Sequence, residues 1–149
     1  MLNRRQFLSS TAALGVGAIK TPTAIAAQQT DKRPLIISTW KFGQAANEKA
    51  LATVLAGGST LDAVEQGIRV TEDSDNSSVG LSGKPSAAGI AQLDACIMHG
   101  PGHRAGAVAA IEGVKHPISA ARRVMEKTPH VMLAGDGARW FAIEAEMNK

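Results

Sequence analysis

The order of apolar and polar positions along the chain predicts an alternation of short strands and longer helices. Residues 35–37 form an apolar, β-branched run, which predicts a buried strand that ends near Trp40. From residue 45 to 56, apolar side chains recur at helical spacing. The glycines at 57–58 then predict the end of that helix, because glycine adopts the left-handed conformation at low cost.

A second helix and a long loop follow. Ser59 and Asp62 resemble a capping box, and apolar positions continue the predicted helix to about Glu72. Residues 73–89 are dense in Ser, Asp, Asn and Gly, which predicts a loop.

The second half of the chain predicts a hairpin and then a helix. Strands are predicted over 93–98 and 105–111, with a turn at 100–102 between them. Pro117 suits the first turn of a helix that runs to Lys127.

One more strand and one more helix complete the pattern. Residues 131–133 predict another buried strand, and Asp136 predicts a cap for a last helix from residue 138 onward. This uneven alternation favours a mixed α/β layered fold over an all-helical bundle.

The first 26 residues predict an export signal rather than a part of the fold. Arg4 and Arg5 precede a weakly apolar stretch at 8–19, and residues 24–26 are small enough for a signal peptidase. The paired arginines indicate the twin-arginine route, with cleavage before Ala27 and a periplasmic or secreted product. The apolar stretch is too short for a bilayer, which needs roughly 20 residues. We therefore expect no membrane association after the signal is removed.

A polar lead-in over 27–34 precedes the single domain predicted over 35–149. The whole chain has a net charge of +3, and the signal holds three basic side chains and no acid. The mature segment is therefore neutral. Neutrality argues against nucleic-acid binding, which requires a lasting basic patch.

Isolated chemical groups indicate neither a metal site nor a reactive thiol. Cys96 is the one cysteine of the sequence, and its apolar neighbours predict a buried, inert thiol without a disulfide. The acidic run at 73–78 lacks the glycine and the glutamate of a calcium loop. His99 and His103 have proline and glycine between them, which disfavours a helical zinc site. Trp40 leaves two interpretations open, a core residue or a flat wall beside a ligand.

A family pattern runs in order through segments 38–43, 57–65, 78–80, 93–98, 106–108 and 116–138. Together these segments resemble the glycosylasparaginases (aspartylglucosaminidases) of the N-terminal nucleophile hydrolase superfamily. The Ser-Thr-Trp opening favours this branch over the related plant-type asparaginases and isoaspartyl peptidases, which usually open with His-Gly-Gly-Ala-Gly.

The resemblance implies an αββα sandwich, two sheets covered by helices, made as a precursor that cuts itself into α and β chains. In that family the cut exposes a threonine whose hydroxyl attacks the side-chain amide of asparagine, while its own amino group acts as base. Water then hydrolyses the aspartyl-enzyme, and no metal or cofactor is required. The α-amino group suits this role because its pKa is about 8, below that of lysine.

Position by position, the resemblance assigns Trp40 to the tryptophan that lines the substrate pocket of the family. It places Phe42 and Ser78 close to that centre, and it implies a scaffold role for the other matched segments. No catalytic residue is implied within this chain, because the family's Asp-Thr cleavage site does not occur in the sequence.

Further departures from the family pattern indicate an incomplete copy. Ser82 stands where the family tends to have a second glycine, Ser86 where an acid is common, and His99 where an aspartate is expected. The sequence also stops a few residues after the last predicted helix. We therefore expect an α-chain half that needs a β-chain complement and does not turn over substrate alone.

The sequence thus predicts the N-terminal part of an exported amidohydrolase that cleaves the bond between N-acetylglucosamine and asparagine, through a threonine absent from this chain. The expected partners are a glycosylated asparagine or other aspartyl-amide substrate and the β-chain complement. Two alternatives stay open. One is a non-catalytic exported scaffold or binding remnant, and the other is the asparaginase or isoaspartyl peptidase branch.

Overall fold

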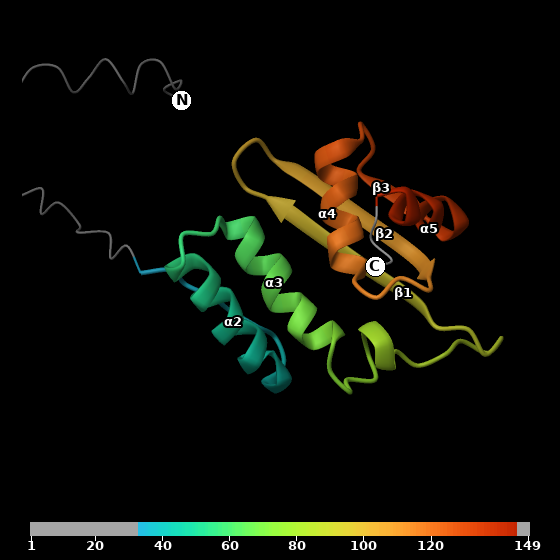
Figure 1. Cartoon of the computed structure of the whole chain (residues 1–149), viewed down its shortest axis with the longest axis horizontal. Coiled ribbons are helices and arrows are strands. Elements are labelled where there is room, and N and C mark those ends of the chain that lie inside the picture. The colour runs from blue at the N-terminus through green and yellow to red at the C-terminus, as the bar shows by residue number, and fades with distance from the viewer. Residues whose placement is uncertain (1–32, 146–149) are drawn as a thin grey trace, which may run out of the picture. The chain divides into compact units, whose positions relative to one another are not determined.

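The structure, a computed structural model, describes residues 33–145, and the predicted signal lies outside the described residues. Within them the chain forms four α-helices, two short 3-10 helices and three strands (Figure 1). In chain order these are η1 (Lys41–Gly43), α2 (Gln44–Leu55), α3 (Thr60–Glu72), η2 (Gly80–Ser82), β1 (Gln92–His99), β2 (Arg104–Glu112), α4 (Pro117–Lys127), β3 (Met132–Ala134) and α5 (Gly135–Glu144).

The three strands form one mixed sheet in the order β1-β2-β3. β1 and β2 pair antiparallel as the predicted hairpin, and β3 adds to β2 in parallel. Helix α4 crosses this sheet, while α2 and α3 pack against each other beside it (Figure 1). The predicted mixed α/β class is therefore confirmed, and the arrangement is consistent with part of an N-terminal nucleophile hydrolase fold.

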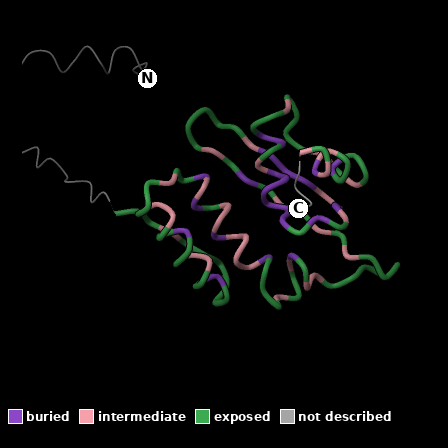
Figure 2. The backbone as a smooth tube through the Cα atoms, in the orientation of Figure 1, coloured by how far each residue is buried: buried purple, intermediate pink, exposed green. Residues whose placement is uncertain are grey.

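The core lies between the sheet and α4. Val108 and Ile111 of β2 and Ile118 and Val124 of α4 are almost completely buried, and the buried segments in Figure 2 run through these two elements. Gly106 allows this close approach, because a Cβ at that position would lie 2.2 Å from a backbone oxygen of α4. The sequence thus places a glycine where helix and strand meet most tightly.

Local start and stop signals were predicted well. Helix α4 has the predicted bounds, Pro117–Lys127. The capping box at the start of α3 is also confirmed: the Ser59 side chain accepts from the Asp62 N–H at 3.1 Å, and Asp62 Oδ2 accepts from the Ser59 N–H at 2.9 Å. Asp136 makes no capping bond, because α5 already begins at Gly135 with Ala134 at its N-cap position.

The buried strand predicted at 35–37 is wrong. This segment forms no strand, and the side chains of Leu35 and Ile37 are 84% and 80% exposed. A strand needs a neighbour for its N–H and C=O groups, and none of the three described strands pairs with this segment. Its composition favours a strand whose pairing partner the described residues do not provide.

Two further burial predictions are wrong for a shared reason. Cys96 is exposed, and in β3 only Leu133 is partly buried while Met132 is exposed. Along β1 the side chains alternate between two faces, so Ile97 points into the core and Met98 does not. Among the described residues, helices cover one face of this sheet and leave the other open.

Candidate functional site

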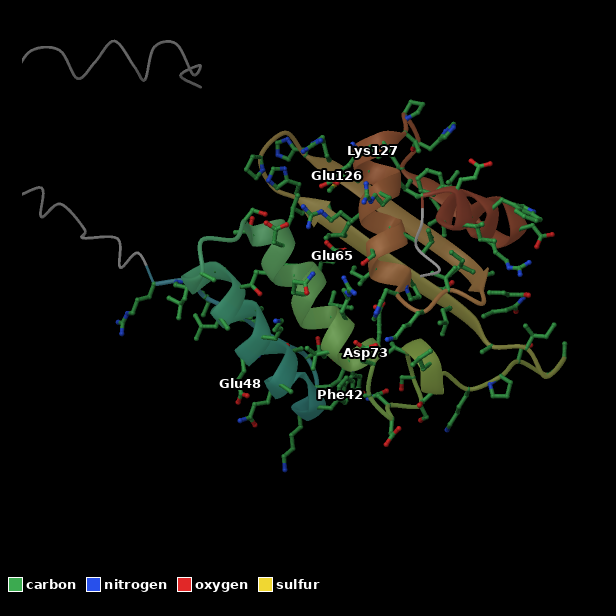
Figure 3. All side chains as sticks on the ribbon, viewed as in Figure 1. Phe42, Glu48, Glu65, Asp73, Glu126 and Lys127 are labelled. Atoms are coloured by element: carbon green, nitrogen blue, oxygen red, sulfur yellow. The ribbon has the colours of Figure 1, made fainter. Side chains whose placement is uncertain are left out.

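The three residues predicted to form the substrate site lie around one cavity. Trp40 and Phe42 come from the turn before α2, and Ser78 comes from the loop after α3, so distant segments meet here. Figure 3 shows Phe42 near the end of α3, where Asp73 is labelled. The cavity has a volume of about 850 Å³ and is lined by Ile37, Ser38, Thr39, Trp40, Phe42, Gly43, Ala46, Ile68, Thr71, Ser78 and Val79.

Two aromatic rings form one wall of this cavity. The rings of Trp40 and Phe42 are stacked, with their centroids 6.5 Å apart and their planes within 11°. Trp40 is 67% exposed and Phe42 is 49% exposed. Trp40 therefore does not belong to the core that the described residues form, and both rings offer apolar surface to a ligand.

Ser78 is held by a tight loop. Its backbone N–H donates to Asn76 Oδ1 at 2.8 Å, and the Lys84 N–H donates to the Ser77 carbonyl at 3.0 Å. Gly80 has a φ of +64°, and a Cβ there would lie 2.0 Å from the Glu72 carbonyl oxygen. The loop therefore sits directly on the C-terminal end of α3, and the Ser78 side chain is exposed at the cavity.

A smaller cavity of about 290 Å³ adjoins the first and shares Ile68, Ser78 and Val79 with it. Besides Ser78, the polar residues that line it are Glu72, Gln92, Asp94 and Cys96.

Glu72 is the buried acid behind this loop. It is only 3% exposed, and its Oε1 accepts from the Ile118 N–H at 3.0 Å. Its Oε2 lies 3.1 Å from His116 Nδ1. Burial raises the pKa of the Glu72 carboxyl to about 7. Glu72 thus joins the end of α3 to the start of α4 and backs the loop that carries Ser78.

No local pattern in the sequence predicts this role of Glu72, because its partners lie more than forty residues further along the chain. A glutamate in the last turn of a predicted helix is usually solvated. Only the packing of α3 against α4 brings the Glu72 carboxyl to the Ile118 N–H, which lies in the first turn of α4 and has no partner within that helix.

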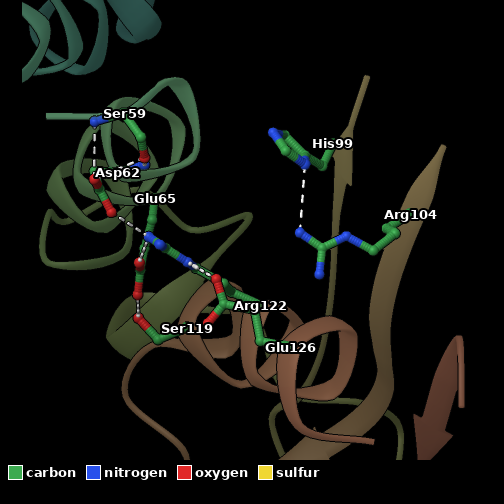
Figure 4. Close-up of polar contacts among 8 residues, drawn as sticks. All are labelled: Ser59, Asp62, Glu65, His99, Arg104, Ser119, Arg122 and Glu126. Atoms are coloured by element: carbon green, nitrogen blue, oxygen red, sulfur yellow. Dashed lines mark hydrogen bonds and ion pairs between the residues drawn. The ribbon is translucent and has the colours of Figure 1, made fainter. Parts of the chain in front are cut away.

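A charged cluster holds α3 against α4 (Figure 4). Arg122 Nη1 lies 2.7 Å from both Asp62 Oδ1 and Glu65 Oε2, and Arg122 Nε lies 2.8 Å from Glu126 Oε1. Hydrogen bonds from Ser59 and from Arg122 lower the pKa of Asp62 to about 2. The cluster fixes the helix pair that carries the Ser78 loop.

The histidines predicted not to form a zinc site lie around the turn between β1 and β2. His99 Nδ1 contacts Arg104 Nη2 at 3.5 Å, as Figure 4 shows. Over residues 33–145, no three His, Cys, Asp or Glu side chains gather as metal ligands would. No helix in the same range has the length and apolar character to cross a membrane.

Comparison with known proteins gives a family match over most of the chain. The sequence profile described as asparaginase matches residues 15–149. A relative named N(4)-(Beta-N-acetylglucosaminyl)-L-asparaginase, from Elizabethkingia miricola, is 44% identical over 154 residues, which cover 99% of this chain and 45% of the relative. The mouse protein (Mus musculus) of the same name is 46% identical, over 73% of this chain and 32% of its own length.

Plant-type asparaginases match as well. The protein of that name from Pyrococcus furiosus is 51% identical over 59% of this chain and 29% of its own length. The chain therefore spans less than half the length of each of these relatives. Its extended match to the family profile and to the Elizabethkingia protein shows that the chain belongs to the asparaginase family, within the N-terminal nucleophile hydrolase superfamily.

Proposed function

We propose that this chain is the N-terminal, α-chain-like part of an exported amidohydrolase that cleaves the amide bond between N-acetylglucosamine and asparagine. The observation that carries the proposal is the meeting of Trp40, Phe42 and Ser78 at one open cavity, in a chain of the asparaginase family. The names of the Elizabethkingia and mouse relatives favour the glycosylasparagine substrate.

In the proposed reaction this chain supplies walls rather than the nucleophile. A threonine at the start of the β chain attacks the amide carbon, and its α-amino group accepts the hydroxyl proton and passes it to the leaving nitrogen. Trp40 and Phe42 exclude water from one side of the substrate, and the Ser78 hydroxyl offers a hydrogen bond to its polar end. Water then releases aspartate and regenerates the threonine.

Two features of the described residues favour a β-chain complement. The apolar segment 35–37 has the composition of a strand but no pairing partner. The sheet also exposes Met98 and Met132 on the face opposite α4. A complement that adds a strand to the segment and a layer to the open face would bury both.

We further propose that residues 1–26 are a twin-arginine signal, that 27–34 are a polar lead-in, and that 35–149 are the α-chain-like part. Expression in a bacterium with a working twin-arginine system tests the first boundary. We expect the exported product to begin at Ala27 on N-terminal sequencing. An uncleaved product that stays in the cytoplasm would refute the export proposal without touching the amidohydrolase proposal.

A hybrid enzyme tests the amidohydrolase proposal directly. Residues 1–149 are joined to the part of the Elizabethkingia protein that this chain does not match, and release of aspartate from N-acetylglucosaminyl-asparagine is measured. We expect the hybrid to cleave itself and to turn over substrate, whereas the 149-residue chain alone should be inactive. Activity of the isolated chain would sink the assignment of the nucleophile to a complement.

The two tryptophans of the chain give a matched pair of variants for this assay. In the hybrid, Trp40→Ala should raise KM and lower kcat/KM by at least about tenfold. A tenfold change corresponds to about 1.4 kcal/mol of binding free energy, which the contact of one aromatic ring with the substrate can supply. Trp140→Ala changes a similarly exposed ring on α5 and should leave both constants unchanged. Equal effects of the two variants would remove Trp40 from the substrate site.

The asparaginase branch is the second candidate, because plant-type asparaginases match 59% to 86% of this chain. Competition separates the two in the same hybrid. A preference for free asparagine over the glycosylated form would favour that branch. A folded hybrid with no activity on either would favour the non-catalytic scaffold.

A further inference from the structure

We propose that Asn47 is a positioning residue that acts through Ser38 to fix the turn carrying Trp40 and Phe42. The proposal rests on the proposed function in one respect, which is that the turn contacts a substrate. Asn47 itself does not line the cavity, whereas Ser38 does. Asn47 therefore acts from the first turn of α2, through its hydrogen bond with Ser38.

The turn is closed at both ends by a small set of contacts. The Ser38 hydroxyl donates to Asn47 Oδ1 and also lies 3.4 Å from the Gly43 carbonyl oxygen. The Gly43 N–H donates to the Trp40 carbonyl at 2.9 Å. These contacts tie residue 38 to the start of α2. They therefore restrict the backbone conformation of residues 39–42, which include both aromatic residues.

Glycine at position 43 serves this closure through space rather than through backbone conformation. Its φ of −69° and ψ of −5° suit any residue. A Cβ there, however, would lie 2.4 Å from the Ser38 Cβ and 2.7 Å from its hydroxyl oxygen. Ser38 therefore packs onto the face of residue 43 where another side chain would stand.

Among the described residues, the side-chain hydrogen bonds of this turn are those of Ser38. The short helix η1 has Trp40 at its N-cap position, without a side-chain capping bond. Asn is a poor helix former that lowers helix stability relative to Ala. Asn47 nevertheless occupies a helical position of α2, and its bond to Ser38 gives that choice a physical reason.

Nuclear magnetic resonance on the 149-residue chain tests the proposal without substrate. The Trp140→Phe background leaves Trp40 as the one tryptophan, so a single indole N–H signal reports on it. We expect its order parameter to be near that of rigid backbone, about 0.85, in the background, and to fall toward that of flexible segments, below about 0.6, with Asn47→Ala. Asn47→Asp keeps an acceptor oxygen and should restore rigidity.

Gln44→Ala is the matched control, because it removes a side-chain hydrogen bond on the same helix, to Glu48 at 3.2 Å, in which no residue of the turn takes part. Gly43→Ala is a second, independent disturbance, since the new Cβ must push Ser38 aside, and it should mobilise Trp40 as Asn47→Ala does. Circular dichroism monitors the helices throughout.

Two results would overturn the positioning role of Asn47. An order parameter for Asn47→Ala equal to that of Gln44→Ala would overturn the proposal. Unfolding of the Asn47→Ala chain would overturn it too, because the contact would then support the whole fold. If Trp40 becomes mobile as expected while the hybrid enzyme proves inactive, the positioning role stands and the proposed function fails.

Discussion

Replacing His116 with Asn should make the folded chain lose stability as the pH rises from 4.5 to about 7, because Glu72 then remains as a buried acid without a titrating partner. Glu72 is 3% exposed, and burial is the main cause of its raised pKa. Asn keeps a short polar side chain next to Glu72 but binds no proton in this range. The variant therefore isolates the titration of one carboxyl.

The sign follows from proton binding. Burial raises the pKa of Glu72 from 4.5 to about 7 in the folded state, so between these values the folded chain binds more protons than the unfolded chain. Stability is then fully present below pH 4.5 and is lost as the pH rises through about 7. The difference between the two pKa values corresponds to at most about 3 kcal/mol in the free energy of unfolding.

His116 works in the opposite direction. Burial is the main cause of its lowered pKa, with the charge of Arg69 second. Between the lowered pKa of His116 in the folded chain and its ordinary pKa of 6.5, the unfolded chain binds more protons than the folded chain. The contribution of His116 to stability therefore grows as the pH rises toward 6.5. In the unmodified chain the two contributions to the pH dependence have opposite signs, so they partly offset each other.

The assay is urea unfolding followed by circular dichroism at several pH values between about 4.5 and 7.5. We expect a small slope for the unmodified chain, falling stability with pH for His116→Asn, and rising stability for Glu72→Gln. Asp73 pairs with Lys115 and also lies 3.6 Å from His116 Nε2. Its pKa is lowered from 3.8, mainly by the hydrogen bond to Lys115, so Asp73 stays ionised across this pH range. If His116→Asn follows the unmodified chain, Glu72 is not the titrating group and the reasoning fails.

Three further stability changes follow from the packing and are measured by denaturant or thermal unfolding. Arg122→Ala leaves three carboxylates without their cation and should lower the free energy of unfolding by about 2 kcal/mol. The loss should be smaller at high salt, and a loss that does not depend on salt would contradict this reasoning. Ala110 has a φ of +50°, so Ala110→Gly should stabilise the chain by up to about 1 kcal/mol, whereas Ala109→Gly should not. Gly106→Ala should cost about 3 kcal/mol or more through its clash with α4, while Gly100→Ala, with open space around it, should be nearly neutral.

Elements with local signals were predictable from the sequence. Pro117 at the start of α4 and the Ser59–Asp62 capping box each act within a few residues, and both elements lie where the pattern put them. The meeting of Trp40 and Ser78 was inferred from the family resemblance, since no spacing rule relates positions so far apart. The role of Glu72 could not be inferred, because it depends on how α3 and α4 pack.

The two kinds of burial error, at residues 35–37 and at Cys96, have one physical explanation. Cys96, Ile97 and Met98 are consecutive apolar side chains, and a nearly continuous apolar run is typical of a strand covered on both faces. A strand covered on one face would alternate apolar with polar residues instead. The described residues cover the Ile97 face only. The same reasoning applies to the exposed, β-branched segment at 35–37, so both places carry sequences suited to a further layer. A complement that failed to protect Met98 and Ile37 from solvent in the hybrid enzyme would contradict this explanation, even if the hybrid were active.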